Sequence, residues 1–390
     1  MKRVCGLVFA ITIMTFNCCK ESKDNGSLFV DDEKITSLLL EVFADSIRVA
    51  GISSAEPMDE LSMLFVYYSY NNLLFLASDD FETIYFIRND SLISKMHAVG
   101  RGPGEYFTLR CICYSTTDSI LYGYEPEKHA IMCYSVPAFK YIKSIKMEDL
   151  FIRAMQYVGD NKILAVCHTD IAGNENNDGL FEISTDKSEI NKIMSTNFFN
   201  TALYSYNAAF FEHDGKPGVI VSDFDNVLYE YNDNKLSKLM SFNYGKRNFP
   251  SVFFQVKESR IDSFNDMMHA LMLESYSVGG QYAIMKGSNL IFWHRSKFGE
   301  FDIKQVATIC DGKECKNYTF RIPGIKMEID PDFIQSDWYS ILINDSKESL
   351  IDSSEPLSPL GQKIIDAIDS QKDENPILLY FKLPFAHQAQ

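Results

Sequence analysis

Short apolar runs separated by turns rich in Asn, Asp and Gly recur along the chain from about residue 35. Apolar and polar positions often alternate within the runs, a pattern typical of antiparallel strands. The runs come in pairs, and the first pair is Leu73–Ala77 followed by Thr83–Ile87. Four further pairs follow, of which the last is the weakest: Ile120–Tyr124 with Ala130–Tyr134, Lys162–Val166 with Gly179–Ile183, Pro217–Val221 with Val227–Tyr231, and Asn289–Trp293 with Phe301–Ile303.

The pairs recur along the chain at comparable intervals, except for a long last step. Equivalent positions in the five pairs are spaced 47, 43, 56 and 70 residues apart: Leu74, Leu121, Leu164, Ile220 and Leu290. A period of about 40–50 residues with four strands in each repeat is typical of propeller blades. A sixth unit contains the runs Asp337–Ile343 and Pro376–Leu383, with a short helix expected at Ser358–Ile368 between them. The sequence therefore predicts an all-β fold, a six-bladed β-propeller over residues 35–390.

Two segments need a place in this ring. The early run Leu38–Phe43 is expected to complete the last blade, because closing the ring removes exposed sheet edges. The long fourth step contains Glu258–Leu273, where apolar residues have helical spacing. We expect a short helical insertion between blades 4 and 5, over about residues 250–275. Its apolar residues should pack on the propeller rather than form a cofactor site: Met267, Met268, Leu271 and Met272.

The N-terminus has the pattern of an export signal. A basic start, Met1 to Arg3, precedes the apolar run Val4–Phe16, which is too short to span a bilayer and suits a signal peptide. Cys18 lies just after this apolar run, at the position where the bacterial lipoprotein pathway attaches lipid. Several acyl chains on one residue give stable anchoring. Cys18 is preferred because Asn17 is small, and Cys19 is the alternative. We thus expect a signal peptide over 1–17, a flexible tether over 18–34, and lipid anchoring in the outer membrane, on its periplasmic or cell-surface face.

That N-terminal pattern leaves a second interpretation open, an ordinary secretory signal followed by cysteines that are not lipidated.

Composition then restricts the partners. The chain is 46% hydrophobic and 13% aromatic, which excludes disorder for most of its length. Its 29 Phe and 21 Tyr favour strands, because flat rings suit a pleated, half-buried surface. The net charge of −16 repels phosphate backbones, so we expect no nucleic-acid partner.

Six cysteines lie beyond the signal region, where an exported protein can form disulfides. Cys310 and Cys315 flank a predicted hairpin turn that a disulfide could bridge. Cys111 and Cys113 stand two apart in an apolar strand and therefore share a face, where buried hydrophobes are favoured over metal ligands. A zinc site would need a second such motif, and the sequence has none.

Two segments resemble those of the six-bladed β-propeller lipoproteins of Bacteroidetes: Gly100–Tyr106, between the first two units, and Glu374–Lys382 near the C-terminus. The resemblance implies a lipoprotein signal and a propeller body. It implies little about activity, because most members have none established. This chain departs from the pattern in its lipobox and in the helical excursion.

The first of these segments is rich in glycine: Gly100, Arg101, Gly102, Pro103, Gly104 and Glu105. A phosphate loop would need a Lys followed by Ser or Thr, and Pro103 removes one backbone donor. The favoured interpretation is a tight inter-blade turn, in which glycines adopt positive φ and Glu105 bonds nearby backbone. Arg101 and Glu105 facing the central channel remains an open alternative.

No catalytic, metal-binding or cofactor motif is found among the histidines, serines and carboxylates. The leading hypothesis is a non-enzymatic envelope protein whose loops or channel bind or scaffold a protein, peptide or glycan. The alternative is a glycan-acting or metal-dependent hydrolase or lyase on the same scaffold. A third hypothesis is a structural accessory of an outer-membrane complex.

Overall fold

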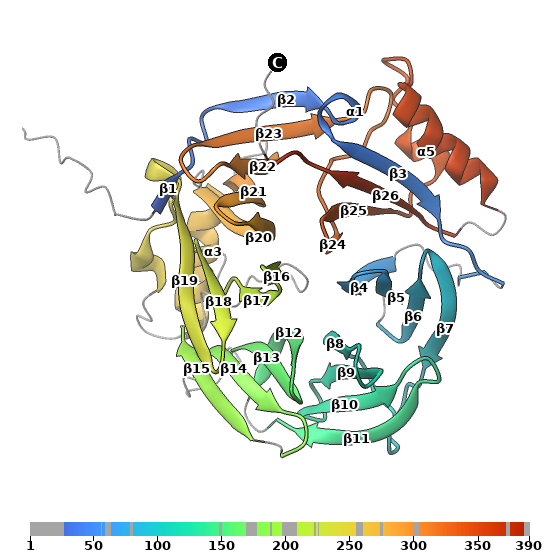
Figure 1. The fold of residues 1–390 in the computed structure, drawn as a ribbon, viewed down its shortest axis with the longest axis vertical. Coiled ribbons are helices and arrows are strands. Elements are labelled where there is room, and N and C mark those ends of the chain that lie inside the picture. Colours follow the sequence, from blue (N-terminus) through green and yellow to red (C-terminus); the bar gives the residue numbers. More distant parts are fainter. Residues whose placement is uncertain are drawn as a thin grey trace, which may run out of the picture.

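The computed structural model describes residues 27–55, 57–58, 64–78, 81–147, 150–168, 178–187, 189–196, 209–221, 224, 226–254, 260–273, 276–298, 304–371 and 375–385. These residues form a ring of six four-stranded antiparallel units around a central axis (Figure 1). The predicted six-bladed β-propeller is confirmed. Four blades are separate sheets, and blades 4 and 5 are joined into one ten-stranded sheet through a single parallel bridge between His213 and Met285.

In blades 1 to 5 the strands run from the channel outward in sequence order. Blade 1 contains β4 (Leu64–Tyr70), β5 (Leu73–Ser78), β6 (Thr83–Arg88) and β7 (Ser91–His97). Blade 2 contains β8 (Cys111–Ser115), β9 (Ile120–Glu125), β10 (Ala130–Ser135) and β11 (Lys140–Lys146). Blade 3 contains β12 (Phe151–Gly159), β13 (Lys162–His168), β14 (Gly179–Ser184) and β15 (Ile190–Ser195).

The second half of the ring has the same plan. Blade 4 contains β16 (Phe210–His213), β17 (Lys216–Val219), β18 (Val227–Asn232) and β19 (Lys235–Asn243). Blade 5 contains β20 (Tyr276–Lys286), β21 (Asn289–Phe298), β22 (Lys304–Cys310) and β23 (Cys315–Arg321). Blade 6 contains β24 (Phe333–Gln335), β25 (Trp338–Ile343), β26 (Ile377–Lys382) and, as its outer strand, β3 (Ser46–Gly51).

The hydrophobic core lies between the blades, which pack face to face. A middle strand is covered on both faces, so every residue of β5 is buried. An outer strand such as β11 is covered on one face and is mostly exposed. This difference explains why the middle strands have continuous apolar sequences and the outer strands do not.

Several hairpins turn on Asn and Asp. Both residues have positive φ in the turns Asn89–Asp90 (50° and 58°), Asp160–Asn161 (48° and 57°) and Asp233–Asn234 (46° and 64°). Two consecutive positive φ values define the type I′ turn, whose twist matches that of the flanking strands. Asn and Asp tolerate this conformation better than other side chains that carry a Cβ.

The N-terminal segment differs from the prediction. It passes along the outside of blades 4 and 5 (Figure 1): β1 (Ser27–Phe29) pairs in parallel with β19, and β2 (Ile35–Leu39) pairs in parallel with β23. Residues 27–34 are therefore part of the folded body, and the tether predicted to reach residue 34 was too long. Leu38–Phe43 was also the wrong closing strand, because Leu40–Phe43 forms the helix α1 and β3 pairs with β26 instead. We call residues 27–39 the N-terminal belt.

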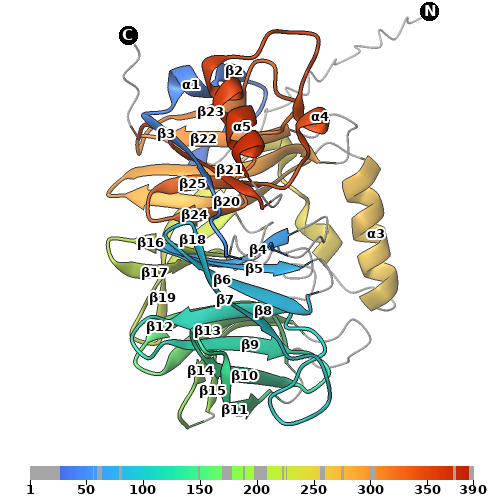
Figure 2. The ribbon, with the colours of Figure 1, turned by 90° about the vertical axis from the view of Figure 1, so that its right-hand side faces the viewer.

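The helical insertion between blades 4 and 5 is confirmed. It contains the 3-10 turns η1 (Gly245–Arg247) and η2 (Ser251–Phe254) and the helix α3 (Arg260–Leu273), which stands on one side of the ring (Figure 2). Met267 and Leu271 are fully buried there against Phe224 and Phe249. Met268 packs on the same cluster, and the side chain of Met272 lies outside the described residues.

Two further helices interrupt blade 6: α4 (Lys347–Leu350) and α5 (Pro359–Ser370). The helix expected at Ser358–Ile368 is α5. Ser358 caps it by accepting a hydrogen bond from the Gly361 amide, and Pro359 begins the first turn, where a missing N–H costs nothing.

Candidate functional site

The main candidate site is a hollow of about 370 Å³ on the propeller axis. All six innermost strands or the turns that follow them contribute to its wall, so we call it the channel mouth. The described residues that line it are Tyr68, Ser69, Tyr70, Asn71, Tyr114, Thr116, Thr117, Gln156, Tyr157, Val158, Gly159, Phe210, Phe211, Glu212, Gly215, Lys216, Pro217, Ala283, Ile284, Ile334 and Ser336. Propeller geometry thus gathers residues from six repeats into one concave surface, the usual form of a ligand site.

Aromatic rings dominate this wall. Four tyrosines and two phenylalanines line it, and Tyr157 stacks on Tyr122 behind it, with ring centroids 5.9 Å apart. Burial raises the pKa of Tyr68 well above its usual range, so its phenol stays neutral. Tyrosine rings offer a flat apolar surface together with a hydroxyl that can donate and accept hydrogen bonds.

The polar groups of the channel mouth are mostly uncharged. Gln156 Nε2 donates to the Tyr68 hydroxyl at 3.2 Å, and the Ser69 hydroxyl donates to the Ile334 carbonyl at 2.7 Å. Glu212 and Lys216 are the charged side chains among the described lining residues. The site can therefore hold a neutral, polar ligand that has apolar faces for stacking.

One charge at this rim is paired within blade 4. Lys216 Nζ lies 2.9 Å from Glu230 Oε1, and His213 Nδ1 lies 2.8 Å from Glu230 Oε2. The hydrogen bonds from Lys216 and His213 lower the pKa of Glu230, and the same contact raises the pKa of Lys216. This pairing leaves the rim with little net positive charge.

The glycine-rich motif forms an inter-blade turn between β7 and β8, as the favoured interpretation held. Glu105 folds back and accepts a hydrogen bond from the Gly102 amide at 2.6 Å. Gly100 has φ +155°, a backbone conformation that residues with a Cβ rarely adopt, so this position favours glycine. Lys128 donates to the carbonyls of Gly102 and Glu105 at 3.1 and 2.6 Å.

The same turn packs on the outer half of blade 2, away from the axis. Gly104 has φ +82°, and a Cβ there would lie 2.6 Å from the Cβ of Tyr141 on the outermost strand. Its carbonyl accepts from the Tyr134 hydroxyl at 3.1 Å. Arg101 and Pro103 are exposed, and none of the six motif residues lines the channel mouth. The alternative that placed Arg101 and Glu105 in the channel was wrong.

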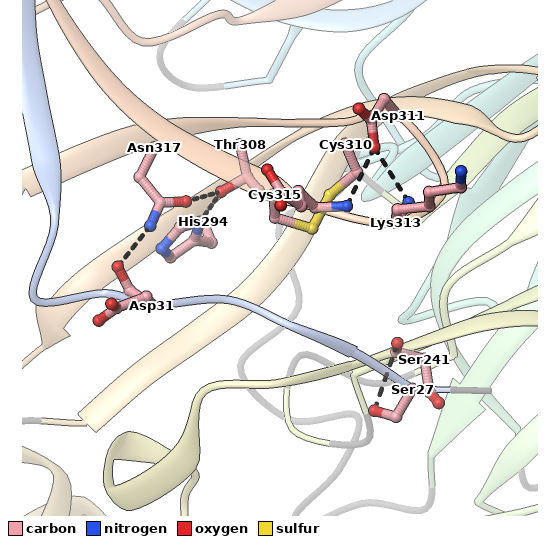
Figure 3. The surroundings of a disulfide bond; sticks show 11 residues. Ser27, Asp31, Ser241, His294, Thr308, Cys310, Asp311, Lys313, Cys315 and Asn317 are labelled. Atoms are coloured by element: carbon pink, nitrogen blue, oxygen red, sulfur yellow. Dashed lines mark hydrogen bonds between the residues drawn. A yellow bond between two sulfur atoms is a disulfide. The ribbon is translucent and has the colours of Figure 1, made fainter. Parts of the chain in front are cut away.

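Cys310 and Cys315 form a disulfide across the turn between β22 and β23, with Cα atoms 4.2 Å apart (Figure 3). The four other described cysteines are buried free thiols: Cys111, Cys113, Cys133 and Cys167. Burial raises the pKa of each of them, which makes them inert core residues rather than nucleophiles or ligands.

Sequence reasoning missed a buried polar network beside this disulfide. Asp32 of the N-terminal belt is almost fully buried and accepts hydrogen bonds from His294 Nε2 (2.8 Å), from the Ser296 hydroxyl (2.8 Å) and from the Ser277 hydroxyl. His294 Nδ1 lies 3.1 Å from the Thr308 hydroxyl (Figure 3). Burial raises the pKa of Asp32, but the hydrogen bonds and charge of His294 and the two serine hydroxyls outweigh it and hold the pKa below its usual value.

An Asp, a His and serines in contact have the composition of a hydrolase triad. Here all the contacts converge on the carboxylate of Asp32, and the Asp32 and His294 side chains are 1% and 0% exposed. A substrate cannot reach them in this arrangement. The network is therefore structural and holds the belt in the body. The sequence does not show this role, because the side chains that donate to Asp32 lie more than 240 positions away along the chain.

A second feature missed by sequence reasoning lies in the crossover from β23 to β24. Burial raises the pKa of Asp330 to about 7. The nearby Arg295 opposes this shift, whereas the negative charges of Asp332 and Glu328 add to it. Burial also raises the pKa of Asp332 to about 6, although its carboxylate accepts from the Leu342 amide at 2.7 Å. No sequence motif marks these two groups, because their shifts come from tertiary burial.

The predicted lipidation residues, Cys18 and Cys19, and the signal peptide lie outside the described residues. Across the described part of the chain, no helix has the length and apolar character needed to cross a membrane. The described side chains also contain no cluster of three or more His, Cys, Asp or Glu residues suited to a metal ion.

The ring of six blades and the hollow on its axis define the class of this protein as a six-bladed β-propeller. A family model described as 6-bladed beta-propeller matches residues 25–283, and the chain belongs to that family.

Two solved structures from Bacteroides are similar over almost their full length. A Bacteroides fragilis protein named as a candidate exported protein has a TM-score of 0.61 at 11% identity, covering 92% of this chain and 99% of that one. A member of the duf4221 family from Bacteroides vulgatus has a TM-score of 0.50 at 10% identity, covering 88% of this chain and 98% of that one. At such identities the likeness concerns the fold alone. Among curated proteins, none matches this chain.

Proposed function

We propose that this protein is a non-enzymatic binding lipoprotein of the outer membrane and that the channel mouth holds its ligand, a glycan or a peptide. The observation that carries the proposal is the aromatic wall of the channel mouth. Four partly exposed rings line this hollow of about 370 Å³, those of Tyr70, Tyr157, Phe210 and Phe211, together with the buried rings of Tyr68 and Tyr114. Flat rings and neutral hydrogen-bonding groups bind uncharged polar ligands through stacking and a few oriented hydrogen bonds.

The proposed address rests on the N-terminal sequence and on the exported-protein name of the Bacteroides fragilis neighbour. Between Cys18 and the first described strand at Ser27, eight residues span at most about 30 Å when extended. An anchor at Cys18 would keep the outer edge of blade 4 within that distance of the membrane. Labelling of cells with an alkyne fatty acid tests this: Cys18→Ser should abolish labelling, and Cys19→Ser should retain it. Labelling that survives Cys18→Ser and disappears with Cys19→Ser would move the anchor by one residue.

The binding proposal is tested by screening the full-length, detergent-solubilised protein on glycan and peptide arrays and measuring hits by calorimetry. Tyr70 lies in the channel mouth, and Tyr70→Ala should weaken binding about tenfold, as expected for one lost aromatic contact. Tyr229→Ala is the matched control, because Tyr229 is another partly buried tyrosine that does not line the channel mouth. Equal affinities of the two variants for every hit would refute the channel mouth as the binding site.

A further inference from the structure

A second hollow of about 340 Å³ lies where blade 6 meets blade 1. We call it the side pocket, and the residues that line it are Arg48, Asn71, Asn72, Gln335, Ser336, Trp338 and Tyr380. They come from β3, β24, β25 and β26 of blade 6 and from the turn between β4 and β5 of blade 1. The site exists only because the ring closes, since it brings the first and last repeats together.

The side pocket adjoins the channel mouth. Asn71 and Ser336 line both hollows. Each is an exposed turn residue with positive φ, 51° and 56°, and the Ser336 hydroxyl donates to Asn71 Oδ1 at 3.3 Å. This single pair of turns forms the whole boundary that the two hollows share, so a ligand in one can extend over it into the other.

The chemistry of the side pocket repeats that of the channel mouth. Trp338 provides a partly exposed ring, and Asn72 and Gln335 provide side-chain amides. A hydrogen bond within the protein orients each amide. Asn72 Nδ2 donates to Asn89 Oδ1 at 2.7 Å, and Gln335 Nε2 donates to the Leu73 carbonyl at 3.2 Å. Their remaining donor and acceptor sites are available to a ligand.

Charge at the side pocket is paired within the protein. The Arg48 guanidinium lies 3.9 Å from the centre of the Tyr380 ring and is hydrogen-bonded to Asp90. Lys382 Nζ lies over one face of the Trp338 ring, 4.7 Å from its centre, and donates to Asp337 Oδ1 at 2.6 Å, so a ligand would stack on the other face. A ligand with its own net charge would compete with these pairs, whereas an uncharged ligand would leave them intact.

We propose that the ligand is a linear, uncharged oligosaccharide that spans the channel mouth and the side pocket. Sugar rings have apolar faces that stack on aromatic side chains, and their hydroxyls point in many directions, which suits amides and hydroxyls set at irregular spacing. The inference rests on the proposed binding function and narrows it to one ligand class and one path.

The test uses calorimetry with the full-length protein in detergent. A glycan array first selects the best-bound linear series among malto-, cello- and chitooligosaccharides, and affinities are then measured from the monosaccharide to the hexasaccharide. We expect affinity to rise with length beyond the unit that fills one hollow. Trp338→Ala should remove this gain, about three- to tenfold for the longest members, and leave the shortest member unchanged.

Controls keep the outcome interpretable. Trp338→Phe retains a ring and should retain most of the gain. Asn72→Ala changes an exposed turn residue, so it tests the side pocket even if Trp338→Ala fails to fold. Tyr70→Ala, in the channel mouth, should weaken every length.

Two results would overturn the inference and leave the proposed function standing. One is saccharide binding that does not depend on length or on the side-pocket variants. The other is binding of uncharged Gly-Ser-Asn hexapeptides with no binding of saccharides. Absence of binding to both ligand classes would overturn the proposed function as well.

Discussion

Replacing Asp32 by alanine should detach the N-terminal belt from blades 4 and 5. In the native protein the carboxylate accepts hydrogen bonds from His294, Ser277 and Ser296 inside the body. Asp32→Ala leaves an imidazole and two hydroxyls buried without this acceptor. A buried donor left without its acceptor typically costs about 1–3 kcal/mol, so for the three donors together we take about 3–5 kcal/mol. We expect the opening free energy of the belt to fall by that amount.

Hydrogen exchange read by mass spectrometry measures this opening directly. About 1.4 kcal/mol corresponds to a tenfold change, so amides of β1 and β2 should exchange about two to four orders of magnitude faster. Amides of β9 in blade 2 should be unaffected. The ring itself should stay closed, because β3 pairs with β26 along its whole length independently of Asp32.

Asp31→Ala is the matched control. The Asp31 side chain pairs with Lys34, which is 84% exposed, so its loss should leave the exchange of the belt unchanged. Its carbonyl, which accepts from Asn317 Nδ2 at 2.8 Å, survives the substitution. If β1 and β2 keep wild-type protection in Asp32→Ala, or lose it equally in Asp31→Ala, the network does not hold the belt.

The same carboxylate makes belt docking depend on pH. Because the folded state holds the pKa of Asp32 below its ordinary value, its contribution to stability is fully present above the unfolded pKa of about 4. The contribution is lost as the pH falls through the lower folded value. Exchange of β1 and β2, corrected for the intrinsic rate at each pH, should therefore accelerate below about pH 4 in wild type. The acceleration should be absent from Asp32→Ala.

Three further predictions concern stability. Gly104→Ala should lower the free energy of unfolding by about 1–3 kcal/mol more than Gly159→Ala, because both glycines have positive φ but only Gly104 has a close neighbour; urea denaturation of the two variants compares them. Reducing the Cys310–Cys315 disulfide, or replacing both residues by serine, should cost at most about 2 kcal/mol, since the closed loop is short; equal denaturation midpoints with and without reductant would contradict a stabilising role. Asp330→Asn should stabilise the protein by about 2 kcal/mol at pH 8 and not at pH 4, because a carboxyl with its pKa raised to about 7 loses stability as the pH rises through that value; a pH series of thermal unfolding decides.

The repeats were predictable because burial on both faces leaves a local mark. In blade 1 the recognised runs Leu73–Ala77 and Thr83–Ile87 correspond to the fully covered middle strands β5 and β6. The outer strands were less visible, because most of their residues are exposed, as in β11. The weakest pair shows the limit: its second run was predicted at Phe301–Ile303, which lies outside the described residues, while β22 begins at Lys304.

The strand that closes the ring was predicted in the right region but with the wrong residues. Leu38–Phe43 is apolar enough for a strand, yet β2 ends at Leu39 and α1 follows. Ser46–Gly51 pairs with β26 instead, at the far end of the chain, where Ile47 and its partner Phe381 are 334 positions apart. Sequence periodicity indicates which residues can form strands. Which of them closes the ring depends on which segment can reach the free edge of β26 in the folded protein.

By itself, the sequence determined the fold class, the number of repeats, the helical insertion and the turn formed by the glycine-rich motif. These features follow from interactions between residues close in the chain: side-chain alternation, positive φ at Asn, Asp and Gly, and helical spacing. Only the tertiary structure decided the channel mouth, the side pocket and the anchoring of Asp32. Each of these brings together residues from distant repeats, such as Asp32 and His294, 262 positions apart, and only closure of the ring sets their distance.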